Sequence, residues 1–251
     1  RAIELAKKHG AELTGVTLFD VDRLDETGAV PIGAGRFAKE LGQTRLEQAR
    51  EVIAAATAHF YRDRMGERYD CSRAVTDGRF YLIRNFMPHR PLARDSRYGY
   101  QVQANWGAWQ RWYDGKPEAA GPIQSQFFRP KPVVELFDTQ QDPWQVHNLA
   151  GEPVQEETLN RLEADLDRWM IETRDVGLIP EPLIYDLIGP NRQFRTIYEY
   201  AQSDRYPVAE LLGIAKNASS GDRKRLAEYL SLLKHNHPAA RWWGAYGLFL
   251  V

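Results

Sequence analysis

Short apolar runs in the middle of the chain predict a β-hairpin and one further strand. The hairpin combines CSRAVT (71–76) and RFYLIRNF (79–86) on either side of Asp77-Gly78. Asp-Gly between two β-prone runs is a strong hairpin signal, because a type I′ turn requires positive φ at both central residues. VVELFD (133–138) is a third β-prone run. The pattern therefore predicts three short strands.

Helical spacing marks the second half of the chain. Residues 156–174 predict an amphipathic helix that is ended by Gly177 and the Pro-Glu-Pro of 180–182. Its apolar positions share one side: Leu159, Leu162, Leu166, Trp169 and Met170. Acids lie on or beside the opposite side and cluster in the first half, where they complement the helix dipole: Glu156, Glu157, Glu163, Asp165 and Asp167.

The last part of the chain predicts three more helices after a connector. The connector covers 183–203, and the helices, separated by short polar breaks, cover 207–218, 223–234 and 239–251. His235 and His237 lie in the break before the last helix. They suggest either a metal site or an interhelical turn, and the turn is favoured because no partner ligands accompany them.

The amino-terminal part predicts most of an αβα repeat. A helix over 1–9 is followed by Gly10, a buried strand over 12–19, a loop, and a long alanine-rich helix over 36–58. This segment, 1–57, resembles the universal stress protein family, whose fold is a nucleotide-binding α/β sandwich. The glycines of the 28–35 loop could cradle a phosphate, but they lack the strand-to-helix placement such loops need, so a flexible loop is favoured.

Composition limits the function classes. The chain has 251 residues, 43% of them hydrophobic, and a net charge of −1, which argues against a polyanion-binding protein overall, and no nucleic-acid partner is expected. A single cysteine allows no intrachain disulfide, and no apolar run reaches about 18 residues, so neither a disulfide scaffold nor a membrane span is predicted. No signal peptide is recognised, and both ends look cut.

Residues 61–91 concentrate the candidate chemistry. They hold seven arginines, no lysine and four acids. Arginine favours planar, bidentate recognition of carboxylate, phosphate or sulfate. The alternative is that each arginine pairs with a neighbouring acid. Beyond the hairpin, a proline-stiffened loop carries His89 and Arg90 side by side.

Aromatic residues gather further along the chain. Trp106, Trp109, Trp112 and Tyr113 are spaced for one face of a short helix. They suggest either a sugar-stacking platform or core packing, and core packing is favoured.

The arginine-rich stretch and a second motif resemble the carboxy-terminal part of sulfatases, over about residues 59–182. The second motif, PVVELFDTQQDPWQVHNLA, matches the family signature P-x-E-L-Y-D-x-x-x-D-P-x-E-x-x-N-L-A, with Phe137 for the tyrosine and Gln145 for the glutamate. Asp142 and Asn148 suit turn or cap positions, and His147 is interpreted as part of that turn rather than as a metal ligand.

The resemblance implies an α+β fold: a small antiparallel sheet, formed by the hairpin and the 133–138 strand, on which the 156–174 helix packs. The expected organisation is a partial αβα segment at 1–57, the sulfatase subdomain at 58–185, a connector at 186–203 and a truncated helical segment at 204–251. The last segment resembles HEAT-type helical repeats, whose open end could pack on a partner.

Sulfatase chemistry, as the family implies it, uses a formylglycine made from a C/S-x-P-x-R motif and a calcium ion beside it. The 251 residues contain no such motif. Cys71-Ser72-Arg73 lacks the proline and lies on a predicted strand, so it is rejected. We therefore expect no metal site, no cofactor and no sulfatase turnover from this chain alone.

A substrate-facing edge remains. The family's small subdomain helps line the substrate cleft, and His89 and Arg90 are the candidates for contacting a sulfated sugar or an aryl sulfate. Arg62 and Arg64 are weaker candidates because they precede the hairpin.

Two function classes stay open. The first is a composite or truncated bacterial chain that carries the carboxy-terminal portion of a sulfatase. The second is a nucleotide-binding or interaction module built on 1–57, which ATP binding measured by calorimetry would favour. Localisation stays unassigned, because sulfatases of this kind are usually exported whereas stress proteins are cytoplasmic.

Overall fold

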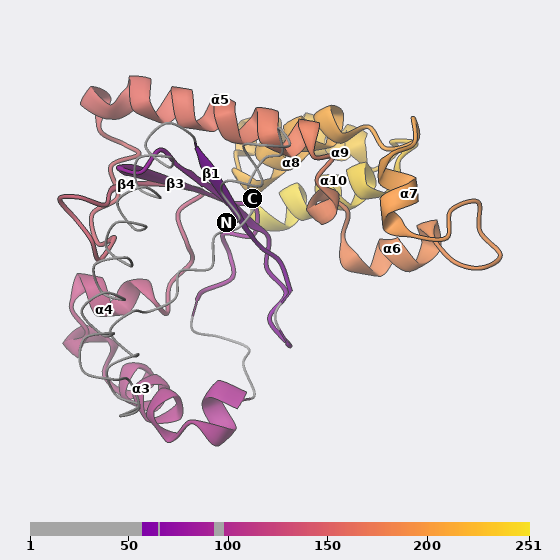
Figure 1. The fold of residues 1–251 in the computed structure, drawn as a ribbon. Helices are drawn as coiled ribbons and strands as arrows, with labels where there is room; N and C mark the ends of the chain where they lie inside the picture. The colour runs from indigo at the N-terminus through magenta and orange to yellow at the C-terminus, as the bar shows by residue number, and fades with distance from the viewer. Residues whose placement is uncertain (1–56, 65, 93–97) are drawn as a thin grey trace, which may run out of the picture.

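The computed structural model describes residues 57–64, 66–92 and 98–251. The αβα prediction for 1–57, with its glycine-rich loop, falls outside these described residues in all but its last position and stays a prediction. The described residues form an α+β fold, as expected: one small antiparallel sheet surrounded by helices (Figure 1).

The sheet has four strands in the described part of the chain, in the order β1-β2-β3-β4 and antiparallel throughout. Their bounds are β1 (Ala58–Arg62), β2 (Ser72–Thr76), β3 (Phe80–Asn85) and β4 (Val134–Asp138). Three of these strands were predicted. β1 was not: the predicted alanine-rich helix ends at residue 58, where β1 begins, and no strand is predicted for 59–62, which pair with β2.

The hairpin between β2 and β3 is confirmed, but its predicted type I′ turn is wrong. Thr76 pairs with Tyr81, so four residues lie between the paired positions, and of the Asp77-Gly78 pair only Gly78 has positive φ, at 92°. The Asp77 carboxylate instead accepts hydrogen bonds from the backbone N–H groups of Arg79 (3.0 Å) and Phe80 (2.8 Å). These side-chain hydrogen bonds stabilise the turn, so Asp77 does not need the positive φ of a type I′ turn.

One face of the sheet is covered by α5 (Glu156–Glu172), the long helix along the top of Figure 1. Alternate strand residues point at it, because side chains along a strand alternate between faces. The fully buried side chains of this layer include Val75, Leu82, Leu136, Leu162, Leu166 and Met170. The predicted apolar side of the helix is therefore confirmed for Leu162, Leu166 and Met170.

Asp165 departs from the predicted polar side of this helix. It is buried, and its Oδ2 lies 2.9 Å from Nε2 of His59 on β1. The His59 ring also stacks on Trp169, with ring centroids 4.9 Å apart. The carboxylate is accommodated because it has a hydrogen-bonding partner on the edge strand that the sequence did not reveal.

A buried arginine ties the sheet to the turn after α5. Arg73 on β2 is 1% exposed. Its Nε and Nη2 donate to Asp175, and both Nη atoms donate to Asp63, at 2.9 and 3.2 Å. Asp175 also accepts from the Gly177 N–H (2.8 Å), which caps the short helix after α5. Two carboxylates thus compensate one buried guanidinium.

The carboxy-terminal helices pack on the same core. Trp243 is buried, donates from Nε1 to the Leu178 carbonyl (2.9 Å) and meets Phe86 edge to face. His89 Nδ1 lies 2.7 Å from the Tyr246 hydroxyl. One continuous set of buried side chains therefore runs from the sheet to the last helix.

The remaining elements confirm the three predicted terminal helices and add short helices inside the predicted connector. The helices are η2 (Tyr98–Val102), α3 (Ala104–Gly115), η3 (Pro117–Ala119), α4 (Pro122–Gln126), η4 (Pro153–Gln155), η5 (Val176–Leu178), α6 (Glu181–Leu187), α7 (Ile197–Ala201), α8 (Val208–Ser219), η6 (Arg223–Arg225), α9 (Leu226–Leu232) and α10 (Pro238–Leu250). The likeness of the last helices to HEAT repeats stays a prediction.

The tryptophan-rich helix α3 lies below the sheet in Figure 1 and packs largely on its own aromatic partners. Trp109 stacks on Phe127 at 4.7 Å, and Tyr113 stacks on Phe128 at 4.2 Å. Trp112 is exposed. Trp109 and Tyr113 therefore serve packing, the interpretation favoured over a sugar-stacking platform, whereas Trp112 faces solvent.

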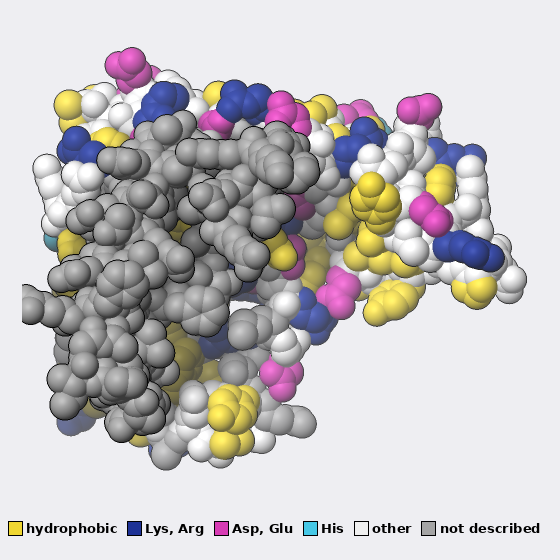
Figure 2. Space-filling view, viewed as in Figure 1, with side chains coloured by type: hydrophobic (Ala, Val, Ile, Leu, Met, Phe, Trp, Pro, Cys, Tyr) yellow, Lys and Arg dark blue, Asp and Glu magenta, His cyan; other side chains and the backbone are white. Residues whose placement is uncertain are grey.

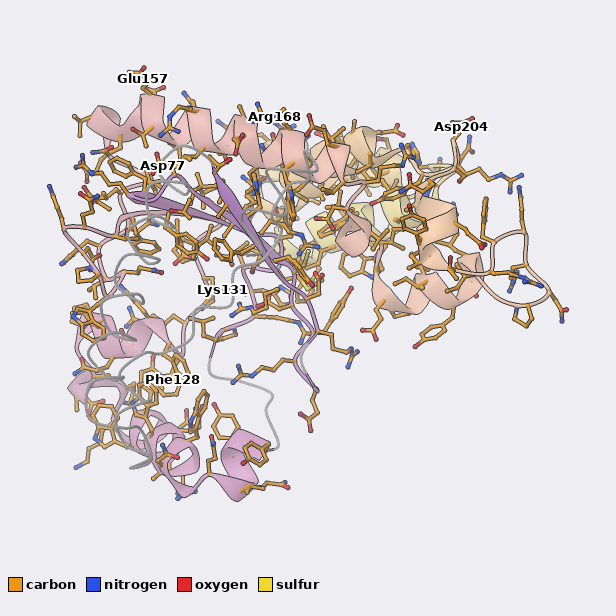
Figure 3. All side chains as sticks on the ribbon, viewed as in Figure 1. Asp77, Phe128, Lys131, Glu157, Arg168 and Asp204 are labelled. Carbon is orange, nitrogen blue, oxygen red and sulfur yellow. The ribbon has the colours of Figure 1, made fainter. Side chains whose placement is uncertain are left out.

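Charged side chains of both signs lie side by side on the surface. Lys, Arg, Asp and Glu side chains gather along the upper edge of the molecule, where α5 lies (Figure 2). Glu157 and Arg168 stand on this edge (Figure 3). Within the described ranges, no helix combines the length and apolarity needed to cross a membrane.

The first prediction concerns the Arg73 contact. A Cβ built on Gly177 would overlap Nη2 of Arg73. Because the guanidinium is held by two carboxylates, Gly177→Ala is expected to lower the free energy of unfolding by about 1–3 kcal/mol. The matched control is Gly213→Ala on the exposed side of α8, where the Cβ meets nothing within 4 Å. That variant should gain up to about 1 kcal/mol in urea unfolding. Equal effects of both substitutions would contradict the Arg73 contact.

The second prediction concerns pH. Burial, followed by the nearby charges of Arg90 and Lys131, lowers the pKa of His89. The native state therefore favours neutral His89, so its contribution to stability is present above about pH 6.5 and is lost as the pH falls through the lowered pKa. We expect His89→Gln to lose less stability than the wild type between pH 7.5 and 5 in urea unfolding. An identical loss in both proteins would show that His89 is not involved.

Candidate functional site

Most arginines of the 61–91 stretch are used within the fold. Arg79 donates twice to Asp138, at 2.7 and 3.0 Å. Arg84 donates to the Lys216 carbonyl (2.9 Å) on α8 and lies 3.4 Å from Glu163. With Arg73 already placed, these three side chains support the alternative in which the arginines hold elements together.

Arg64 and Arg90, two of the four predicted site residues, lie over the ring of Tyr69. Their guanidinium carbons are 5.7 and 5.9 Å from its centroid. Arg64 also pairs with Glu181 on α6, and the Tyr69 hydroxyl accepts from the Glu181 N–H (3.2 Å). We call Arg64, Tyr69 and Arg90 the Tyr69 cluster.

The other two predicted residues have different hydrogen-bonding partners. His89 packs against α10, with its ring 5.3 Å from those of Tyr246 and Phe249. Arg62 is at the end of β1 and pairs with Asp70. The fold therefore brings Arg64 and Arg90 together over one ring. It directs His89 toward α10 and places Arg62 at a groove on the sheet.

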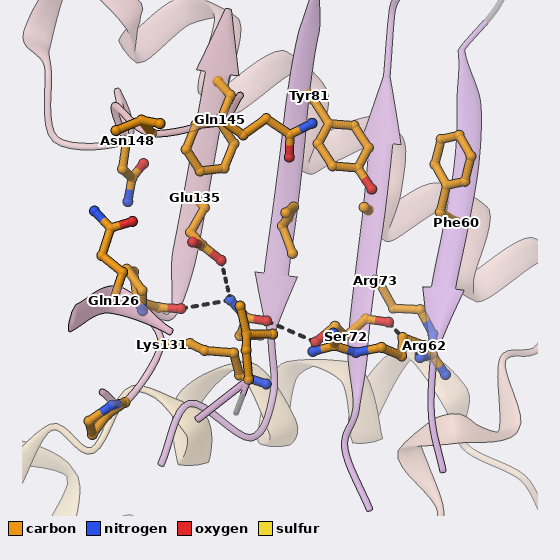
Figure 4. A pocket seen from close by; sticks show the side chains of 18 of the residues that line it. Phe60, Arg62, Ser72, Arg73, Tyr81, Gln126, Lys131, Glu135, Gln145 and Asn148 are labelled. Carbon is orange, nitrogen blue, oxygen red and sulfur yellow. Dashed lines mark hydrogen bonds between the residues drawn. The ribbon is translucent and has the colours of Figure 1, made fainter. Parts of the chain in front are cut away.

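The groove lies on the face of the sheet opposite α5 and has a volume of about 560 Å³. Residues of all four strands line it, alternate ones on β3 and β4, and a polar row crosses β2, β3 and β4 at one end (Figure 4). Ser72 donates to Asn85 (2.8 Å), and the Asn85 amide donates to Glu135 (2.6 Å) and to the Pro132 carbonyl (2.9 Å). This row is fully hydrogen-bonded, so it is a rigid floor.

The walls of the groove are largely aromatic. Phe60 and Tyr81 meet edge to face at 5.8 Å, and Trp144 is 86% exposed at the edge. Amide side chains complete the lining, from Gln126, Gln145 and Asn148. Gln145 lies beside Tyr81 in Figure 4.

Charge in the groove is mostly positive. Lys131 Nζ donates to both oxygens of Asp70, at 2.6 and 2.7 Å, and burial lowers the pKa of Lys131. Burial also raises the pKa of Glu135, although the Asn85 hydrogen bond opposes the shift. Glu135 is the single acidic side chain among the described lining residues, against the basic Arg62, Arg129 and Lys131. Arg73 also lines the groove, but its guanidinium is buried against Asp63 and Asp175 and adds no free charge.

The signature motif forms the end of β4 and the loop after it. Asp142 Oδ2 accepts from the backbone N–H groups of Val146 and His147, both at 2.7 Å. Asn148 accepts from the Leu136 N–H (2.9 Å) and donates to the Val134 carbonyl (3.1 Å). The predicted turn role of Asp142 is confirmed, whereas Asn148 pairs with the edge of β4 in addition to capping the next segment.

The rejected nucleophile and the histidine pair have structural explanations. Cys71 is buried, and burial raises the pKa of its thiol to about 12, so it is not a reactive group. His237 accepts from the Ala239 N–H (3.2 Å) at the start of α10 and lies 2.8 Å from the Tyr200 hydroxyl. No group of three or more His, Cys, Asp or Glu side chains is arranged for a metal ion among the described residues.

Sequence reasoning missed most of the groove. Ser72 and Asn85 gave no local signal, because both are buried like the apolar residues beside them on β2 and β3. The register that aligns them with Glu135 depends on β3 pairing with β4, which is distant in sequence. Trp144 belongs to the signature motif, but the sequence did not indicate that its side chain is exposed.

Comparison with known proteins supports the sulfatase part of the interpretation. No known family profile matches the chain. The chain is similar to an ulvan-active sulfatase of Formosa agariphila, with 33% identity over 156 residues. The match covers 61% of this chain, too much to lie within 1–57, and 25% of the relative. The chain thus spans about a quarter of the length of that protein. It therefore contains a sulfatase-like region.

Proposed function

We propose that residues 58–185 are the carboxy-terminal subdomain of a sulfatase-like sulfuric ester hydrolase and line part of its substrate cleft. The similarity to the ulvan-active sulfatase carries this proposal. The four-stranded sheet covered by α5 supports it, since a small sheet with one long helix is the arrangement that the resemblance implies. The proposed substrate is a sulfated sugar of the kind found in ulvan.

The Tyr69 cluster is the proposed point of contact on the cleft. Its two guanidinium groups share one aromatic ring, and Arg64 is exposed on the surface while paired to Glu181. A sulfate group offers several acceptor oxygens, which suit the fixed donor fork of arginine better than a point charge. His89, next to Arg90, would lie at the edge of this contact.

Bond breaking is assigned to groups outside residues 58–185. The proposal takes no step through calcium or formylglycine, because the described side chains do not form a donor set that fits the metal and Cys71 is buried. In this segment, the chemistry is recognition: charged donors hold an anionic substrate while other groups of the enzyme react with it.

A binding prediction tests the contact. The double variant Arg64→Ala/Arg90→Ala should bind ulvan oligosaccharides about five- to thirtyfold more weakly by calorimetry, if each cation contributes about 0.5–1 kcal/mol. Arg225→Ala is the matched control, since Arg225 forms the same kind of exposed pair with Glu228 on α9. Its affinity should equal that of the wild type. Equal affinities for all three proteins would remove the Tyr69 cluster from the proposal.

A turnover prediction tests the assignment of catalysis. The chain, supplied with calcium, should release no sulfate from 4-nitrophenyl sulfate or from ulvan oligosaccharides above a buffer blank. Release that copurifies with the chain through two different columns and vanishes on heat denaturation would overturn the recognition role.

A further inference from the structure

The edge of the sheet groove carries an aromatic side chain on a hydrogen-bonded turn, and the described residues leave this side chain uncovered. Trp144 is 86% exposed. The turn that carries it is fixed at both ends: the Asp142 N–H donates to the Asp138 carbonyl (2.7 Å), and the Asp142 carboxylate accepts two backbone N–H groups beyond Trp144. Gln145, the next residue, has φ of 54°, a left-handed conformation that this turn maintains.

A ligand in this groove would meet flat apolar surfaces on its walls and polar groups on its floor. Phe60 is 47% exposed and Tyr81 stands beside it on the next strand but one. The Ser72–Asn85–Glu135 row lies at one end of the same face of the sheet. The volume of about 560 Å³ lies within the range of about 300–1,000 Å³ common for small-molecule sites.

The charge of the groove selects the class of ligand. Arg129 is exposed and has no carboxylate partner among the described residues. Arg62 donates to Asp70 from Nη2, and its side chain remains 43% exposed. The acid at the floor, Glu135, is engaged by Asn85. Cationic donors at one end and aromatic walls at the other favour a ring with an apolar face and an anionic substituent.

We propose that this groove is a second saccharide-binding site, in which Trp144 stacks on a sugar ring and Arg62 and Arg129 contact its sulfate. The choice of a sulfated sugar rests on the proposed function; the groove itself does not. It is distinct from the Tyr69 cluster, because neither Tyr69 nor its two arginines lines the groove. A long sulfated chain would thus contact the subdomain at two places.

The test is a titration of the 251-residue chain with ulvan oligosaccharides, monitored by calorimetry. Trp144→Ala should weaken binding about tenfold, whereas Trp144→Phe should retain most of the affinity. Trp112→Ala is the matched control, because Trp112 is also exposed, at 40%, but lies outside the groove. The truncation removes an exposed side chain, and thermal unfolding of each variant verifies that the fold is kept.

Charge recognition is tested with the same titration. Arg129→Gln should weaken binding of the sulfated oligosaccharide but not of its desulfated counterpart. The matched control is Arg168→Gln on α5, on the other side of the sheet (Figure 3). Equal binding of sulfated and desulfated sugars by the wild type would overturn the anionic part of the inference.

The outcomes separate the two sites. Loss of affinity in Arg64→Ala/Arg90→Ala without loss in Trp144→Ala overturns the groove and leaves the proposed function standing. Loss in Trp144→Ala alone supports the groove and removes the Tyr69 cluster. No binding by the wild-type chain, or a Trp144 that an added quencher cannot reach, overturns the groove and indicates that protein covers it.

Discussion

The buried guanidinium of Arg73 is the constraint on which the rest of the fold depends. A charge at 1% exposure is tolerable only if carboxylates meet it from fixed directions. Asp63 follows β1 and Asp175 follows α5, so satisfying Arg73 ties the end of the edge strand and the end of the helix to β2. The Tyr206 hydroxyl donates to the Asp175 carbonyl, which extends the same hub toward the terminal helices.

The two faces of the sheet have different roles. The face toward α5 is closed by leucine packing and by paired charges, so it is structural. The opposite face keeps a polar row, aromatic walls and exposed cationic donors. Since strand residues alternate in direction, the same short strands supply both faces. Residues on the groove side of these strands can therefore form a recognition surface while their neighbours on the other side pack in the core.

The arginine-rich stretch illustrates how far sequence reasoning reached. It correctly identified the hairpin and offered the two interpretations of the arginines, namely anion binding or pairing with acids. Arg73, Arg79 and Arg84 follow the second, because their partners Asp175, Asp138 and Glu163 lie on elements far along the chain. Arg64 also pairs with a distant acid, Glu181, but its side chain stays 49% exposed, so Arg64 and Arg90 remain candidates for the first. No pattern in the sequence separates these groups, since the choice depends on which acids the fold brings near.

The sequence by itself determined the elements: the Asp-Gly hairpin, the strand at 134–138, the amphipathic α5 and the terminal helices. Local periodicity and turn chemistry suffice for these. Only the tertiary structure decided that residues 58–62 form an edge strand, that Asp165 is buried against His59, and that Trp144 stands exposed beside a groove. These features depend on contacts between different segments of the chain. Such contacts produce no periodic pattern of apolar and polar residues in the sequence.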